Sequence, residues 1–132
     1  MKPQVTIFTD GCSVPNPGNS GAGIVLLAGE NRKELAVPLG HGTNNTAELL
    51  AMIHALKALK CPCEVTIYTD SQITQKIAMG ENQASSNMDL WLMYRTVAHD
   101  HDVKVIWIRK DSHIENMEAH RLANQAAAMN AA

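Results

Sequence analysis

The chain is predicted to fold as an α/β domain with a mixed five-stranded sheet and helices on both faces. Two observations predict this class: three strand patterns follow one another at the start, and helix and strand patterns alternate after them. The 132 residues, 45% of them hydrophobic, suffice for one core but not for two ordinary domains. We therefore expect a single domain over residues 1–132.

The first part of the chain carries the three strand patterns. Gln4 to Thr9 alternates apolar and polar residues and is rich in β-branched side chains, which suits a strand. The prolines and glycines of Gly11 to Gly23 predict a turn-rich connection, which leads to a second strand from Gly23 to Leu27. A turn at Gly29-Glu30-Asn31 then brings the chain into a third strand around Lys33 to Leu39.

The rest of the chain alternates helices and strands. Apolar residues recur at helical spacing after Thr43, and either Thr43 or Asn44 is expected to cap that helix. The polar stretch from Gly80 to Asn87 is expected to be a linker. The expected elements are helices at Thr43 to Lys60, Gln72 to Met79, Asn87 to His99 and Glu115 to the C-terminus, and strands at Glu64 to Thr69 and Val103 to Ile108.

Several apolar side chains are expected in the core. In the helix from Asn87 to His99, the spacing of Leu90, Met93 and Val97 predicts the inward face. The two tryptophans, Trp91 and Trp107, lie in apolar segments and are expected in the core rather than as platforms for stacking bases.

Charge and cysteine content narrow the class of protein. The net charge of −2 provides no overall attraction to nucleic acid, so any such binding must come from local sites. The cysteines, Cys12, Cys61 and Cys63, are odd in number, and Cys61-Pro62-Cys63 is too tight to bridge without strain. The sequence shows no secretion signal and no apolar run of membrane-spanning length. We expect reduced thiols, no membrane association and a cytoplasmic location.

Three acidic residues stand where the predicted layout brings them together. Asp10 and Asp70 each follow a strand, and Glu48 lies one turn into the helix that follows the third strand. Ligands bind at such strand ends in open α/β sheets, and gathered carboxylates repel one another unless a hard divalent cation neutralises them. Each acid taken alone is more simply a capping or solvated residue. The three together favour a magnesium or manganese site.

The residues around these acids resemble type 1 ribonuclease H. The matching motifs occur in the order that is typical of the family and span nearly the whole chain. They are Thr9-Asp10-Gly11, Thr43-Asn44-Asn45-Thr46-Ala47-Glu48-Leu49, Tyr68-Thr69-Asp70-Ser71-Gln72 and Asn116 with Leu122-Ala123. The resemblance implies the ribonuclease H-like fold and a metal-dependent endonuclease that cuts the RNA strand of RNA–DNA hybrids.

The resemblance also implies a mechanism and a ligand set. Asp10, Glu48 and Asp70 match carboxylates that hold two Mg2+ or Mn2+ ions, with Asp10 between them. The products would carry 5′-phosphate and 3′-hydroxyl ends. No protein nucleophile is implied, and Cys12 is better explained as a small loop residue.

Selectivity for RNA requires contacts to the 2′-hydroxyl, which DNA lacks. Amide side chains both donate and accept hydrogen bonds, which suits this task, although Asn44 is explained as well by helix capping. The positions that the resemblance assigns to substrate binding are Gly11, Cys12, Ser13, Asn16, Thr43, Asn44, Asn45, Ser71 and Gln72, with Thr43 at a phosphate of the DNA strand.

The sequence departs from the family pattern at two positions. His120 stands where the family usually has a fourth aspartate. An imidazole there either coordinates the second ion, which favours manganese over magnesium, or holds a metal-bound water, or has no role. The loop from Arg109 to His113 lacks the glycines that usually surround a mobile catalytic histidine. His113 is a candidate substitute, and Lys110 falls nearer the expected spacing.

The basic helix and loop with which many bacterial members grip the hybrid are missing. Residues 79–88 contain no lysine or arginine, so we expect weak hybrid affinity unless another protein delivers the substrate. A monomer is expected. Two other functions stay open: a nucleic-acid-binding module that lost activity through His120, and another nuclease of the same superfamily, such as an exonuclease or a junction resolvase.

Overall fold

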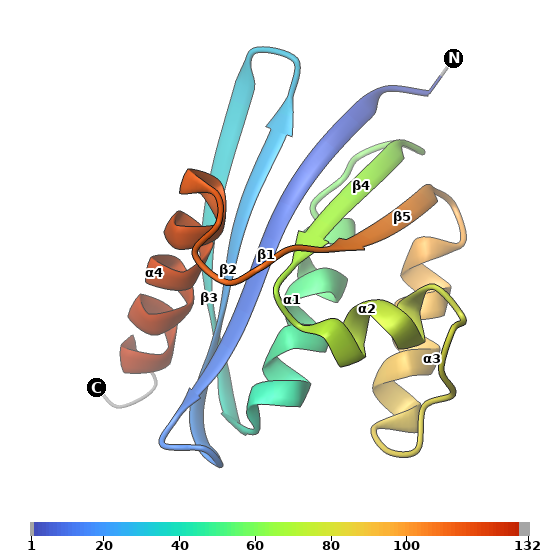
Figure 1. Cartoon of the computed structure of the whole chain (residues 1–132). Coiled ribbons are helices and arrows are strands. Elements are labelled where there is room, and N and C mark those ends of the chain that lie inside the picture. The colour runs from blue at the N-terminus through green and yellow to red at the C-terminus, as the bar shows by residue number, and fades with distance from the viewer. Residues whose placement is uncertain (1, 130–132) are drawn as a thin grey trace.

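The computed structural model describes residues 2–129, which form a five-stranded sheet with helices on both faces (Figure 1). The strands are β1 (Gln4–Val14), β2 (Gly18–Ala28), β3 (Asn31–Gly42), β4 (Glu64–Thr69) and β5 (Asp102–Trp107). The helices are α1 (Asn44–Lys57), α2 (Gln72–Ala78), α3 (Met88–Ala98) and α4 (Ile114–Met129). The predicted class and order of elements are confirmed. The end of the last predicted helix, residues 130–132, lies outside the described residues.

The sheet is mixed, in the order β3-β2-β1-β4-β5. β1 pairs antiparallel with β2, and β2 pairs antiparallel with β3, whereas β1, β4 and β5 are parallel. The last pair in the register between β1 and β4 is Phe8 with Tyr68. Asp10 and Asp70 therefore follow that pair by two residues each and lie side by side, as predicted. Asp70 directly follows β4, but β1 continues to Val14, so the prediction that the first strand ends before Asp10 is wrong.

The predicted turn-rich connection from Gly11 to Gly23 is wrong. β1 and β2 continue through this segment as a paired ladder that closes only at residues 15–17. Gly11 and Gly23 leave space for neighbouring helices and do not form turns. A Cβ on Gly23 would lie 1.8 Å from the carbonyl oxygen of Ala119, and one on Gly11 would lie 2.2 Å from the backbone of Ala47. The sheet thus contacts α4 and α1 almost backbone to backbone.

Each face of the sheet has its own core. α4 covers one face, where Phe8, Val25, Ile108 and Leu122 are buried. α1 and α3 cover the other face, and Figure 1 shows the two helix layers on opposite sides of the strands. The largest fully buried side chains include Ile7, Ile24, Leu49, Met52, Ile53, Leu56 and Ile67.

The core prediction is confirmed for Trp91 and is wrong for Met93 and Trp107. The buried residues of α3 are Trp91 and Tyr94, whose rings meet edge to face at 5.6 Å, whereas Met93 is 41% exposed. Leu90 and Val97 are half-buried beside them. Trp107 is 43% exposed because β5 is the edge strand, and its indole N–H donates to the carbonyl of Asp70 at 3.2 Å.

The described cysteines are all free thiols, as expected. No helix within residues 2–129 is long and apolar enough to cross a membrane.

Candidate active site

Three carboxylates meet just beyond the point where the pairing of β1 with β4 ends. Asp10, Glu48 and Asp70 each offer an oxygen, and these oxygens lie within 4.8 Å of one another. Asp10 and Glu48 are buried, and Asp70 is half-buried. Such close carboxylates repel one another strongly in a medium less polar than water. Among the residues that the structure describes, this is the one group of three or more acidic, histidine or cysteine side chains close enough together to hold a metal ion.

Hydrogen bonds from β1 and β4 hold the carboxylate of Glu48 in place. Its two carboxylate oxygens accept hydrogen bonds from the backbone N–H of Gly11 at 3.1 Å and from the hydroxyl of Thr69 at 3.4 Å. Burial, and then the nearby carboxylates of Asp10 and Asp70, raise the pKa of Glu48 well above its usual range, against the smaller opposing effect of the Gly11 N–H. The close packing of Gly11 on α1 makes this contact possible.

Asp70 is oriented by a buried amide from α4. The Nδ2 of Asn116 donates to Asp70 Oδ2 at 3.4 Å, while its Oδ1 accepts from the backbone N–H of Asp111 at 2.6 Å. Burial and the charge of Asp10 raise the pKa of Asp70. The bond from Asn116 and the charges of Lys110 and His120 partly offset that rise.

His120 reaches the cluster from α4. Its Nδ1 lies 2.7 Å from Asp10 Oδ2, and its side chain is 39% exposed. The structure thus brings the sequence-predicted fourth residue to the carboxylates, where it contacts Asp10.

An open cavity of about 310 Å³ contains the cluster. It is lined by Asp10, Gly11, Cys12, Asn44, Glu48, Asp70, Lys110 and His120. Burial and the charges of Asp10 and Glu48 raise the pKa of the Cys12 thiol, which opposes formation of a thiolate nucleophile.

The β1–β2 hairpin is tied to the start of α1 by asparagine side chains. The Oδ1 of Asn44 accepts from the N–H of Ser13 at 2.8 Å, and the Oδ1 of Asn16 accepts from the N–H of Asn44 at 3.0 Å. Thr43 is the N-cap residue of α1 and forms a capping box with Thr46. Asn44 therefore does not cap the helix, and within residues 2–129 its NH2 group donates no hydrogen bond to the protein.

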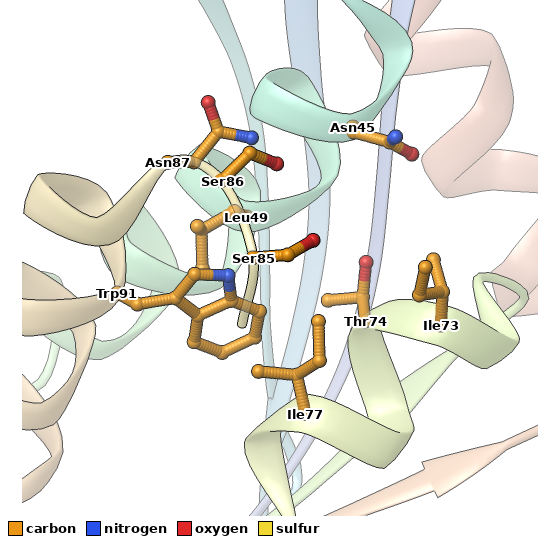
Figure 2. Close-up of a pocket in the computed structure, with 9 residues that line it drawn as sticks. All are labelled: Asn45, Leu49, Ile73, Thr74, Ile77, Ser85, Ser86, Asn87 and Trp91. Carbon is orange, nitrogen blue, oxygen red and sulfur yellow. The ribbon is translucent and has the colours of Figure 1, made fainter. Parts of the chain in front are cut away.

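Asn45 lies apart from the carboxylates. It lines a second pocket between α1, α2 and the loop before α3, where Figure 2 shows Thr74, Ser86 and the indole of Trp91 around the same hollow. Ser71 caps α2, because its hydroxyl accepts from the N–H of Thr74 at 3.4 Å. Gln72, the first residue of that helix, is exposed.

His113 does not line the cavity that contains the carboxylates. Its ring packs against Phe8 and Tyr68, with centroid distances of 5.8 and 6.2 Å, and its Nδ1 lies 2.9 Å from the hydroxyl of Ser112. Lys110, from the same loop, does line the cavity.

Comparison with known proteins relates this fold and site to one family. The family model described as RNase H matches residues 2–128. The chain belongs to the ribonuclease H family. A ribonuclease H of Novosphingobium aromaticivorans is 40% identical over 138 residues, covering 94% of this chain and 96% of the relative. The ribonuclease H of Campylobacter jejuni strain RM1221 is 37% identical over 133 residues, covering 94% and 91%.

Solved structures of ribonuclease H share the architecture. The RNase H1 of Halobacterium salinarum superposes with a TM-score of 0.83 at 28% identity, over 96% of this chain and 98% of that one. The N-terminal RNase H domain of rv2228c from Mycobacterium tuberculosis gives 0.86 at 27% identity, over 98% and 99%. LC11-RNase H1, described in complex with an RNA/DNA hybrid, gives 0.86 at 24% identity, over 97% and 99%, and shares the fold.

The donor set of this ribonuclease H suits hard divalent cations. The clustered ligand atoms are carboxylate oxygens, which Mg2+ and Mn2+ prefer over sulfur or nitrogen. Burial, and after it the neighbouring carboxylates, raise the pKa values of Glu48 and Asp70, and a bound cation would favour their charged forms.

Sequence reasoning did not single out two residues that contact the site. Asn116 was part of a matching motif, yet its partner Asp70 is 46 residues away, so the sequence carried no signal of the contact. Asn124 contacts His120 and Cys12 from the next turn of α4. Only its spacing of four residues from His120 pointed to it.

Proposed function

We propose that this ribonuclease H hydrolyses the RNA strand of RNA–DNA hybrids at the carboxylate cavity, by a two-metal-ion mechanism that leaves 5′-phosphate and 3′-hydroxyl ends. The observation that carries the proposal is the approach of Asp10, Glu48 and Asp70 to within 4.8 Å in an open cavity. LC11-RNase H1, of the same fold, is described with such a hybrid bound.

Asp10, Glu48 and Asp70 would hold two Mg2+ or Mn2+ ions. When bound, the ions would supply activation of the attacking water and stabilisation of the departing 3′ oxygen. The protein holds the carboxylates in place before the substrate arrives. The Gly11 N–H and the Thr69 hydroxyl fix Glu48, and Asn116 fixes Asp70.

Recognition of RNA is assigned to polar groups at the rim of the cavity. The NH2 group of Asn44 and the backbone of Gly11, Cys12 and Ser13 would contact the minor groove, where the 2′-hydroxyls lie. A further set would extend this contact away from the carboxylates: Asn16, Thr43, Asn45, Ser71 and Gln72. Asn45 supports this extension because it lines the neighbouring pocket (Figure 2).

Three further residues have proposed roles: His120, Lys110 and His113. His120 is the fourth member of the site, and its contact with Asp10 supports a role as hydrogen-bond partner of that carboxylate. Lys110 lines the cavity and supplies a positive charge for the phosphate backbone. His113, whose ring packs on Phe8 and Tyr68, would have to leave that contact to assist product release, the role that its sequence position suggested.

One set of incubations tests the function. Labelled RNA–DNA hybrid, duplex DNA, duplex RNA and a four-way junction are each incubated with magnesium and with manganese. We expect cleavage of the RNA strand of the hybrid alone. Cleavage of the junction or of DNA would favour another nuclease of this fold. Hybrid binding without any cleavage would indicate a module that has lost activity.

Substrates with local 2′-deoxy substitution test the recognition of RNA. Replacing a short ribonucleotide stretch with deoxynucleotides should remove cleavage there, because each polar group left unpaired costs about 1–3 kcal/mol. Cleavage that continues through the deoxy stretch would contradict reading of the 2′-hydroxyl.

A further inference from the structure

The side-chain amide of Asn124 contacts the ring of His120, the carbonyl group of His120 and the thiol of Cys12. Asn124 lies one turn after His120 on α4, and its Nδ2 is 3.0 Å from the carbonyl oxygen of His120 and 3.1 Å from His120 Nε2. Its Oδ1 is 3.7 Å from the Sγ of Cys12. The ring of His120 is thereby contacted at both nitrogens, by Asp10 at Nδ1 and by Asn124 at Nε2.

The donor and the acceptor in each of these contacts follow from the chemistry of the groups. A backbone carbonyl only accepts hydrogen bonds, so the Asn124 atom beside the His120 carbonyl must be the NH2 nitrogen. The thiol of Cys12 on the other side of the amide donates to Oδ1, which agrees with that orientation. The same NH2 group points its second hydrogen at His120 Nε2, so that nitrogen is the acceptor.

The tautomer of His120 follows from this orientation. With Nε2 as an acceptor, the ring proton is on Nδ1, where it donates to the carboxylate of Asp10 at 2.7 Å. Both ring nitrogens are then engaged, and neither offers a free lone pair to a metal ion.

We propose that Asn124 is a positioning residue of this ribonuclease H, which holds His120 in the Nδ1–H tautomer so that the ring serves Asp10 as a hydrogen-bond donor rather than serving the metal as a ligand. The inference rests on the proposed function in one respect only: Asp10, the carboxylate so held, is one of the three that would bind the metal ions. Partners of this kind fix the orientation of a ligand and alter its basicity. Asn124 is not among the residues that line the cavity with the carboxylates.

The tautomer is measured in the metal-free protein by two-bond 1H–15N correlation spectra of the histidine rings, with His120 assigned from the His120→Ala variant. The wild type should show a protonated Nδ1 and an unprotonated Nε2 that accepts a hydrogen bond. In Asn124→Asp the side chain keeps its size but only accepts, so Nε2 should become protonated. In Asn124→Leu the Nε2 signal should move, because the bond that it accepted is gone.

Kinetics provide the second measurement. Asn124→Leu should lower kcat on the hybrid about 10-fold and leave KM unchanged, since partners of metal ligands affect the chemical step more than substrate binding. The matched control is Gln125→Leu, on the same exposed stretch of α4, which loses a 3.3 Å bond to Arg121 and no contact with the site. It should keep the wild-type spectrum and kcat. Both side chains are exposed, so circular dichroism should confirm that the variants fold.

A protonated Nε2 in the wild type, or a wild-type His120 spectrum and kcat in Asn124→Leu, would overturn the positioning role. The two proposals fail separately. Absence of hybrid cleavage by the wild type would refute the proposed function, whereas the spectra of the metal-free protein decide the tautomer in either case.

Discussion

At the scale of single residues, the carboxylates that make the site also destabilise the metal-free protein. Asp10, Glu48 and Asp70 crowd their oxygens within 4.8 Å, and two of the three side chains are buried. Burial and mutual repulsion raise the pKa of Glu48, so the folded state binds a proton there more tightly than the unfolded chain does. The site therefore opposes folding at neutral pH when no cation is bound.

Asp10→Asn should abolish cleavage and, in EDTA, raise the melting temperature. The substitution removes a negative charge that metal binding needs. It also removes the repulsion between Asp10 and the other two carboxylates in the metal-free protein. Each ~1 kcal/mol of relief corresponds to roughly 2–8 °C in Tm for a domain of this size. Asp100→Asn, an exposed acid outside the cavity, is the control. Appreciable cleavage by Asp10→Asn with normal metal dependence would sink the mechanism.

The same repulsion predicts a pH dependence of stability. Because folding raises the pKa of Glu48, protonation of this side chain stabilises the folded protein. That stabilisation is complete below the unfolded pKa of about 4.3, and it is lost as pH rises through the folded pKa. The stability gained by Asp10→Asn in EDTA should grow over that range. Denaturant unfolding at several pH values measures it, and a gain that shrinks with rising pH would contradict the repulsion.

His120 offers a test of what the imidazole does. His120→Asp adds a carboxylate to the cluster and should lower the magnesium concentration that gives half-maximal activity, by roughly 10-fold. His120→Ala should lower kcat to a similar extent with magnesium and manganese, because the ring acts through Asp10. A manganese preference in the wild type that disappears in His120→Ala would instead indicate direct coordination. Unchanged rates in both variants would make His120 a bystander.

At the scale of elements, the position of α4 depends on glycines in β2. A Cβ on Gly23 would lie 1.8 Å from the carbonyl oxygen of Ala119, and one on Gly21 would lie 2.3 Å from that of Ala123. No flexible side chain end is available to yield, because both contacts are with backbone. The glycines of β2 and the alanines of α4 therefore set how closely α4 approaches the sheet. That distance determines how His120 and Asn116 contact the carboxylates.

Gly23→Ala should destabilise the protein by about 1–3 kcal/mol or more, because α4 must move off the sheet to admit the methyl group. Activity should fall further than stability alone explains, since α4 carries His120 and Asn116. Urea unfolding and kcat at a temperature where the variant is folded measure the two effects, with Asn19→Ala on the same strand as control. Wild-type stability in Gly23→Ala would contradict the close approach.

At the scale of the whole molecule, the charge distribution limits how strongly the protein binds a polyanion. The net charge is −2, and residues 79–88, between α2 and α3, contain no lysine or arginine. Affinity must come from local groups such as Lys110 beside the carboxylates. Phosphate contacts supply most of the affinity for nucleic acid.

Adding basic residues to this segment should therefore strengthen hybrid binding. Asn82→Lys with Gln83→Lys should lower KM, leave kcat unchanged and steepen the logarithmic dependence of binding on salt by up to about 1 for each new phosphate contact. Glu30→Lys, in the turn between β2 and β3, is the control for a simple gain of positive charge. An equal change in KM for the control would show that net charge, rather than this segment, governs affinity.

The sequence by itself determined the order of strands and helices, the grouping of the three carboxylates and a helix capped at either Thr43 or Asn44. These features are readable because hydrophobic period, capping chemistry and the end of a strand are local properties. The adjacency of Asp10 and Asp70 was also predictable, since both acids stand two residues after the last pair of two parallel neighbouring strands, although β1 itself continues past Asp10. The length of the β1–β2 ladder was not, because the glycines that suggested turns serve contacts with α1 and α4.

Only the tertiary structure decided which partners the site residues take. His120 meets Asp10 across 110 residues and Asn116 meets Asp70 across 46, and such pairs depend on how closely α4 sits on the sheet. The same packing brings Lys110 to the cavity while His113 stacks on Phe8 and Tyr68. A hydrogen bond requires its atoms to within a few tenths of an ångström, and only the packed backbone sets positions that finely.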